Sequence, residues 1–123
     1  MLPVSKLARY PVAPFVVRSS VVPVVVAMQT PKPGRIQEIL DAFAVVSPLV
    51  HLEQGCELYA AHTDGDRCIM VERWTTQADL DAHAAGEPLK ELNRLFGDAL
   101  AKPSEVWVLE NVPFGDPALG TIA

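Results

Sequence analysis

The chain is poor in cysteine. Only Cys56 and Cys68 carry a thiol among its 123 residues. Two cysteines cannot build the disulfide framework of a small secreted domain, and they lack the paired spacing of a zinc site. The three histidines, at positions 51, 62 and 83, also lack metal-ligand spacing with one another or with cysteine. We therefore expect a reduced, cytoplasmic protein that holds no metal.

Long apolar runs and basic clusters are missing as well. No stretch of 18 uninterrupted apolar residues occurs, so no transmembrane helix is expected. After Lys6 and Arg9, prolines at positions 11 and 14 interrupt any signal-peptide core, so secretion is not expected. The ten basic residues are scattered and the net charge is -5, which argues against a nucleic-acid binder. No glycine-rich loop between a strand and a helix supports a dinucleotide cofactor.

What the chain does contain is hydrophobic residues, half of the total, in a length that fits one domain. Residues 1–20 are rich in proline and predict an extended N-terminal arm. Residues 21–112 predict the folded domain, and residues 113–123 a C-terminal tail. A domain of this size buries only about two-thirds of its unfolded surface, so a second copy of the chain would help to complete its core.

The first half of the domain predicts a strand and a helix. Residues 21–28 form a β-branched run typical of a strand buried on both faces, and Pro23 marks its start. Apolar residues then recur at helical spacing from Ile36 to Val46. Pro48 predicts the end of this helix or a kink in it.

A β-hairpin is the clearest local prediction. Two strand-like runs, residues 56–63 and 66–74, flank Asp64-Gly65, a dipeptide typical of a two-residue turn. That turn sets the facing pairs on one side of the hairpin, namely Thr63 with Asp66, Ala61 with Cys68, Tyr59 with Met70, and Glu57 with Glu72. Trp74 falls on the same side and Cys56 on the other, so the register predicts no bridge between the cysteines.

The second half predicts two helices and a strand. They are a short helix after Thr76, a second helix from Pro88 to Leu100, and a strand at residues 105–112. Leu80 and His83, three residues apart, share one face of the short helix.

The element order of strand, helix, strand, strand, helix and strand is the split βαβ pattern of a ferredoxin-like fold. The fold class is therefore α+β, with an antiparallel sheet that carries its helices on one face. The other face of the sheet is also apolar, with Leu58, Ile69 and Val71 on it. A second subunit that packs sheet against sheet would cover this face, so we expect a homodimer.

Four features, taken in order, resemble the antibiotic biosynthesis monooxygenase family. They are Lys32-Pro33-Gly34 at a helix start, Glu53 with Gly55-Cys56 and Tyr59 entering a strand, Glu72 with Trp74 ending the next strand, and Leu80 with His83 one helix later. The resemblance covers residues 22–110. It implies a dimeric α+β barrel in which each subunit holds a pocket between its sheet and its helices.

The resemblance also implies a range of activities. Members of the family oxygenate aromatic polyketides or quinols without metal or flavin, related members degrade haem, and others isomerise small sugar-derived signals. The haem-degrading relatives use an asparagine on the first strand, where this chain has Ala27 and no asparagine close by. This departure argues against haem degradation. The resemblance gives the fold far better than the substrate.

His83 is the candidate catalytic residue. A neutral imidazole can take a phenolic proton near pH 7 or donate a hydrogen bond to a bound carbonyl. The alternative is a partly exposed histidine at the boundary of the core.

The candidates for substrate contact are Trp74, Tyr59, Met70, Leu80 and Asn93. The ring of Trp74 can stack on a planar substrate or simply close the core, and Tyr59 has the same two alternatives. Arg94, beside Asn93 on the last helix, is expected to be exposed near the pocket mouth. Glu57 and Glu72, if they face each other, would repel when both are ionised.

Two functional hypotheses follow. The first is a cofactor-independent monooxygenase that oxidises a small aromatic phenol, naphthol or quinol with O2, with the substrate itself supplying the electrons. The second is a non-catalytic small-molecule binding or stress protein of the same fold.

Overall fold

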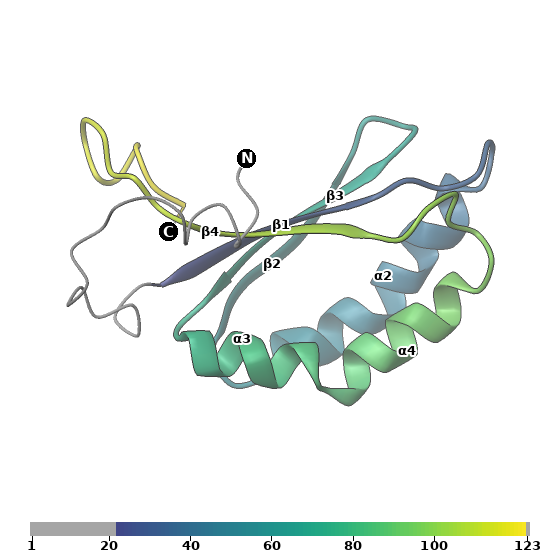
Figure 1. Cartoon of the computed structure of the whole chain (residues 1–123), viewed down its shortest axis with the longest axis horizontal. Coiled ribbons are helices and arrows are strands. Elements are labelled where there is room, and N and C mark those ends of the chain that lie inside the picture. Colours follow the sequence, from purple (N-terminus) through teal and green to yellow (C-terminus); the bar gives the residue numbers. More distant parts are fainter. Residues whose placement is uncertain (1–21, 123) are drawn as a thin grey trace.

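Residues 22–122 are described in a computed structural model of the chain (Figure 1). In chain order the elements are β1 (Pro23–Gln29), α2 (Ile36–His51), β2 (Cys56–Thr63), β3 (Cys68–Trp74), α3 (Gln77–Ala84), α4 (Glu87–Phe96) and β4 (Glu105–Glu110). This is the predicted ferredoxin-like order, with the second helical segment divided into α3 and α4. The predicted N-terminal arm lies outside the described residues.

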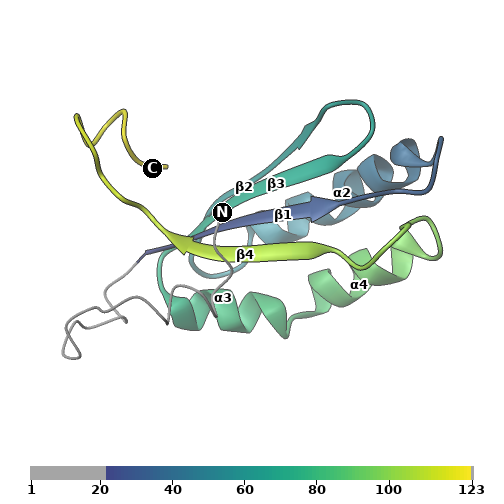
Figure 2. The ribbon, with the colours of Figure 1, turned by 45° about the horizontal axis from the view of Figure 1, so that its top comes forward.

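The four strands form one antiparallel sheet in the order β2-β3-β1-β4. The three helices α2, α3 and α4 all lie against the same face of this sheet (Figure 1, Figure 2). The predicted α+β fold class is therefore confirmed.

β1 and α2 supply much of the core. Val24 to Ala27 are all buried, as predicted for a central strand. Of the two alternatives predicted at Pro48, an end of the helix or a kink in it, the first is wrong, because α2 continues to His51. Proline removes one backbone N–H and crowds the preceding turn. The apolar packing of Val46 and Val50, which are both fully buried, nevertheless holds the helical path through it.

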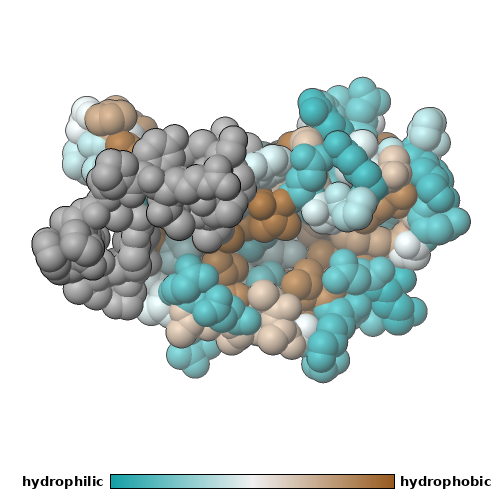
Figure 3. Space-filling model, in the orientation of Figure 1, coloured by the Kyte–Doolittle hydropathy of each residue, from teal (hydrophilic) through white to brown (hydrophobic). Residues whose placement is uncertain are grey.

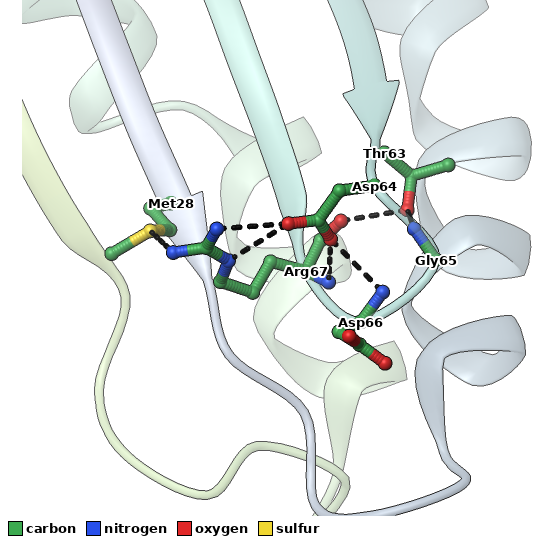
Figure 4. A network of polar contacts seen from close by, with 6 residues as sticks. All are labelled: Met28, Thr63, Asp64, Gly65, Asp66 and Arg67. Carbon is green, nitrogen blue, oxygen red and sulfur yellow. Dashed lines mark hydrogen bonds and ion pairs between the residues drawn. The ribbon is translucent and has the colours of Figure 1, made fainter.

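The β2–β3 hairpin has a longer loop than predicted (Figure 4). Thr63 pairs with Cys68, so the loop spans residues 64–67 instead of two residues. The Asp64 carboxylate accepts hydrogen bonds from the backbone N–H groups of Asp66 and Arg67, at 2.9 and 2.8 Å. It also lies 2.8 Å from the Arg67 guanidinium. This side-chain turn prevails over the two-residue turn that the Asp-Gly dipeptide favours.

The predicted hairpin register is consequently wrong by two residues, and Tyr59 faces Glu72 rather than Met70. A shift of two residues keeps each side chain on its original side, because side chains alternate along a strand. Tyr59, Met70, Glu72 and Trp74 therefore still share the side of the sheet that faces the helices.

A β-bulge between Cys56 and Leu58 changes the sides at the start of β2. Glu57 turns to the side of the sheet away from the helices, the open side. Its carboxylate lies there 3.4 Å from the Arg73 guanidinium. The predicted facing pair of Glu57 and Glu72 is therefore wrong, and the repulsion expected between them does not arise.

The same bulge changes the side of the sheet on which Cys56 lies. Both cysteines are free, as predicted. Cys56 pairs with Trp74 across the hairpin, however, and packs against the same core as Cys68. The predicted separation of the two cysteines onto opposite faces is wrong, because the bulge adds one residue to β2 and so reverses the alternation of side chains before it.

The C-terminal elements are shorter than predicted. α4 ends at Phe96 instead of Leu100, because Gly97 adopts a positive φ of 51° and stops the helix. β4 ends at Glu110, and the segment that follows is closed by two hydrogen bonds, of 3.2 and 3.0 Å, between the Asn111 side chain and the backbone of Ile122. Within residues 22–122, no helix is long and apolar enough to cross a membrane.

The face of the sheet away from the helices is mostly apolar, with the Glu57–Arg73 ion pair at one end of it. By strand alternation it carries Val24, Val26, Leu58, Ile69, Val71, Trp107 and Leu109. The homodimer expected to cover this face stays a prediction.

Candidate active site

A cavity of about 370 Å³ lies between the sheet and the helices. Its apolar wall is formed by Val25, Ala27, Phe43, Tyr59, Met70, Leu80, Ala84, Leu89, Leu92, Phe96, Val106 and Val108. Its polar members are Gln29, Glu72, Gln77, Asp81, His83, Asn93 and Ser104. Figure 3 shows hydrophobic residues in the hollow between the sheet and the helices. An apolar cavity with a few polar groups is the usual form of a small-molecule site.

α3 places His83 on the wall of this cavity. The helix begins at a cap in which the Thr76 hydroxyl accepts a hydrogen bond from the backbone N–H of Asp79, at 3.1 Å. Gly55, at φ 78°, lies so close to the Asp79 side chain that a Cβ would collide with it, so glycine allows α3 to start beside β2. Leu80 and His83 share the inner face of α3, as predicted, and both are buried. The alternative of a partly exposed histidine at the boundary of the core is wrong, because His83 is 5% exposed.

The imidazole of His83 is held by Glu53, from the loop between α2 and β2. Its Nδ1 lies 2.9 Å from Oε1 of Glu53. A neutral imidazole that donates its Nδ1–H to this carboxylate keeps Nε2 as an acceptor. Nε2 has no hydrogen-bond partner within residues 22–122. The arrangement therefore suits a proton acceptor on the cavity wall.

Glu53 belongs to one of the sequence features that resemble the family, but the sequence predicted no role for it. The residue lies between two elements, so no periodicity relates it to α3. Only the tertiary fold brings its carboxylate to His83 across 30 residues of chain.

The indole of Trp74 lies behind the imidazole of His83 instead of in the cavity. The two ring centroids are 4.5 Å apart, with 29° between the ring planes. Trp74 is fully buried and is not among the residues that line the cavity. Two alternatives were predicted for Trp74, contact with a substrate and closure of the core. The structure favours the second, because the indole stacks on the imidazole and does not line the cavity.

Glu72 brings a buried carboxyl group to the wall. Its Oε1 accepts a hydrogen bond from the indole Nε1–H of Trp74, at 3.0 Å. Burial raises the pKa of Glu72, and the Trp74 hydrogen bond and the nearby His83 oppose this shift without cancelling it. A carboxyl group with a raised pKa thus lies next to the candidate base.

Tyr59 lies on the wall beside His83, as predicted. The two ring centroids are 5.7 Å apart and the rings meet edge to face, at 66°. Burial raises the pKa of the Tyr59 phenol, and the charge of Glu72 raises it further. The phenol therefore stays protonated at neutral pH and can donate a hydrogen bond.

The remaining candidates for substrate contact come from three different elements, and all of them line the cavity. Met70 on β3 and Leu80 on α3 line the cavity and are buried. Asn93 is an exposed residue of α4 that still reaches the wall. Arg94 does not line the cavity, and its guanidinium lies 2.6 Å from the carboxylate of Glu91 on the helix surface.

Sequence reasoning missed four polar residues of the wall, Gln29, Gln77, Asp81 and Ser104. For Gln29 a signal existed, because it follows Val25 and Ala27 at intervals of two and so shares their side of β1.

None of the described residues that line the cavity is a lysine or an arginine. Within the part of the chain that the structure describes, no group of three or more His, Cys, Asp and Glu residues could hold a metal ion.

Comparison with known proteins places these features in context. Residues 23–95 match the family described as "Antibiotic biosynthesis monooxygenase". The "Probable quinol monooxygenase YgiN" of Escherichia coli strain K12 is 33% identical over an alignment of 76 residues, and the match covers 52% of this chain and 73% of that protein. The protein of the same name from Shigella flexneri matches to the same extent.

Solved structures share the fold. The crystal structure of a conserved protein from Methanosarcina mazei Go1 is 25% identical with a TM-score of 0.68, and the match covers 76% of this chain and 95% of that one. Rv0793 from Mycobacterium tuberculosis is 22% identical with a TM-score of 0.68, covering 74% and 95%. The second likeness shows the fold alone.

Proposed function

This chain belongs to the antibiotic biosynthesis monooxygenase family, and from that premise we propose that it oxidises a small, neutral aromatic phenol, naphthol or quinol with O2. The observation that carries the proposal is the Glu53–His83 pair, which aims a hydrogen-bonded imidazole into an apolar cavity. The match to a relative named as a quinol monooxygenase supports the same class of substrate.

The charge of the wall favours a neutral substrate. Glu72 and Asp81 line the cavity, and no lysine or arginine among the described residues lines it with them. A carboxylated or phosphorylated aromatic would therefore enter without a cationic partner, which is costly in a buried site. A phenol or quinol enters uncharged and needs only one proton acceptor at the reacting end.

The proposed reaction starts with proton transfer to Nε2 of His83. The O–H bond of the substrate breaks, its electron pair stays on the oxygen and spreads into the ring, and the carboxylate of Glu53 stabilises the imidazolium. Burial favours this step only where a charge partner is fixed in place, which the 2.9 Å contact provides. The protonated phenol of Tyr59 is available to donate a hydrogen bond to the substrate anion.

Oxygen transfer then follows from the chemistry of the anion. A ring carbon bonds to O2, and the peroxide accepts a proton and loses water, which leaves a carbonyl on that carbon. A naphthol and O2 thus give a naphthoquinone and one water, and the four electrons that reduce O2 come from the substrate. We propose that the protein supplies the base, the anion partners and an apolar enclosure for this sequence.

Oxygen uptake tests the proposal. The protein, chelator-treated and freed of flavin, is mixed with 1-naphthol or 1,4-naphthalenediol in an oxygen electrode, and the product is analysed after reaction in ¹⁸O₂. We expect one O2 consumed per substrate, with one labelled atom in the quinone. A requirement for stoichiometric haem, flavin or metal would contradict substrate-supplied electrons. Binding of these aromatics with no uptake above the uncatalysed rate would contradict the enzyme and favour a non-catalytic binding protein.

A further inference from the structure

Resting on the proposed function, we propose that Gln29 and Ser104 form a second polar subsite, at the end of the cavity away from His83. This subsite binds the far hydroxyl of a substrate that carries oxygen at both ends. The substrate class is then narrowed from phenols in general to elongated aromatic diols, of which fused two-ring quinols are the simplest.

Gln29 is an unusual side chain for the floor of an apolar cavity. It is the last residue of β1, it lines the cavity, and it is 4% exposed. Its Nε2 donates a hydrogen bond of 3.4 Å to the hydroxyl of Ser104, which also lines the cavity. Its Oε1 is fully buried and has no partner among residues 22–122. Native proteins leave few such acceptors unpaired, so this one points to a ligand that donates to it.

The subsite lies far from His83 along the sheet. Val25 pairs with Glu72, which neighbours His83, whereas Gln29 pairs with Cys68. Gln29 lies four positions after Val25 on β1, which is about 13 Å between their Cα positions. Both ends belong to one cavity, so a single ligand can meet both.

The wall between the two ends is apolar. Ala27 lies between Val25 and Gln29 on β1, Met70 pairs with it on β3, and Phe43 of α2 adds an aromatic ring. These three side chains offer no polar group to a hydroxyl on the cavity wall midway between the two ends, and Asn93 reaches the cavity from α4. The polar groups at its ends therefore favour a planar apolar body with one oxygen at each end.

The chemistry of the pair fits a hydroxyl group. Gln29 Oε1 is an acceptor, and the Ser104 hydroxyl, while it accepts from Gln29, still has its own proton to donate. A hydroxyl on the ligand can donate to the first and accept from the second. An aromatic with hydrogen at that position leaves the Gln29 oxygen unpaired in a buried site, so the subsite discriminates between a diol and the matching mono-ol.

Calorimetric binding of 2,6-naphthalenediol and 2-naphthol without oxygen tests the subsite. The two ligands differ only in the far hydroxyl. The parent protein should bind the diol about three- to tenfold more tightly, the gain expected from one neutral hydrogen bond. Gln29→Leu should abolish this preference, because it removes the acceptor that distinguishes the two ligands. Gln37→Leu makes the same change at an exposed position of α2 and should keep the preference.

The outcomes separate the subsite from the proposed function. Equal binding of the two ligands by the parent protein, or a preference that survives in Gln29→Leu, overturns the subsite. If Gln29→Leu does not fold, Ser104→Ala takes its place, and a preference retained there overturns the subsite as well. A preference that Gln29→Leu abolishes, in a protein that takes up no oxygen with any diol, supports the subsite and overturns the monooxygenase.

Discussion

Oε1 of Glu53 lies 2.9 Å from Nδ1 of His83, although 30 residues separate them along the chain. Glu53 follows the end of α2 and His83 lies in the last turn of α3, so two separate elements fix the ring between them. Trp74 stacks on one side of the imidazole and prevents it from turning. The position of a candidate base is thus set by a carboxylate and an indole that do not themselves line the cavity.

His83→Gln tests the base. Glutamine retains much of the volume of the buried ring and can still donate to Glu53, but it cannot accept a proton near neutral pH. We expect turnover to fall by about 10²–10⁴-fold, the usual range for a positioned acid or base. His62→Gln, at an exposed position of β2, is the matched control. Full oxygen uptake by His83→Gln with every accepted substrate would show that the histidine only packs the core.

Glu53→Gln tests the positioning of that base. The amide can accept the same hydrogen bond but cannot stabilise an imidazolium by charge. We expect kcat to fall at least about tenfold while KM changes little, because Glu53 acts through His83. Glu57→Gln, on the open side of the sheet, is the comparison. An equal loss of kcat in both variants would mean that the effect is on folding and not on the base.

Trp74→Ala tests the support behind His83. Removing a fully buried indole costs about 3–5 kcal/mol, so the free energy of unfolding should fall by this amount in urea titrations. Trp74→Phe keeps a ring behind the imidazole and loses the hydrogen bond to Glu72 and part of the ring volume, so its loss of stability should be clearly smaller than that of Trp74→Ala. A similar small loss in both variants would contradict a supporting role for the indole.

Glu72→Gln tests the raised pKa of the buried carboxyl group. Because its pKa is higher in the folded than in the unfolded state, Glu72 stabilises the fold most below about pH 4.3, where it is protonated in both states. That contribution is lost as pH rises through the folded pKa. Glutamine stays neutral, so the stability of Glu72→Gln relative to the parent protein should increase with pH in this range. The exposed Glu87→Gln should show no such trend, and a flat difference for Glu72→Gln would contradict the shift.

Light scattering tests the expected homodimer. The apolar open face of the sheet should bring two copies together at micromolar concentration, because a patch of this kind is rarely left exposed. Val71→Glu places a charge at the centre of that face and should yield monomers. Leu52→Glu, at a residue that is 85% exposed outside the sheet, should remain dimeric. A monomeric parent protein would contradict the sheet-to-sheet arrangement.

The hairpin shows how far alternation alone can predict the cavity wall. The loop length was wrong by two residues, yet Tyr59 and Met70 were still placed on the correct side, because an even shift leaves alternation intact. The bulge at Cys56 and Leu58 is an odd shift, and there the sides of Cys56 and Glu57 were wrong. Neither the Asp64 side-chain turn nor the bulge has a periodic signal in the sequence.

The residues of the candidate site also differ in whether the sequence could predict them. His83 and Leu80 could be assigned together because one helical turn relates them. Glu53 could not, since its contact with His83 depends on how the loop after α2 meets α3. The stacking of Trp74 behind His83 depends on how deeply the indole lies in the core. Strand alternation predicts the side of the sheet on which a residue lies, but not this depth. Local periodicity therefore predicts which residues face the cavity, and tertiary packing decides which of them reach it.

The acidic wall also bears on how the cavity empties. Hydroxylation of a quinol gives a hydroxyquinone, which is a vinylogous carboxylic acid and loses its proton far more readily than the quinol does. Asp81 and Glu72 line the cavity, and no lysine or arginine among the described residues lines it with them. Under the proposed function, we therefore expect this wall to repel a product that becomes an anion, although it admits the neutral precursor. We then expect the chemical step to favour product release, so that accumulated product competes poorly with fresh substrate.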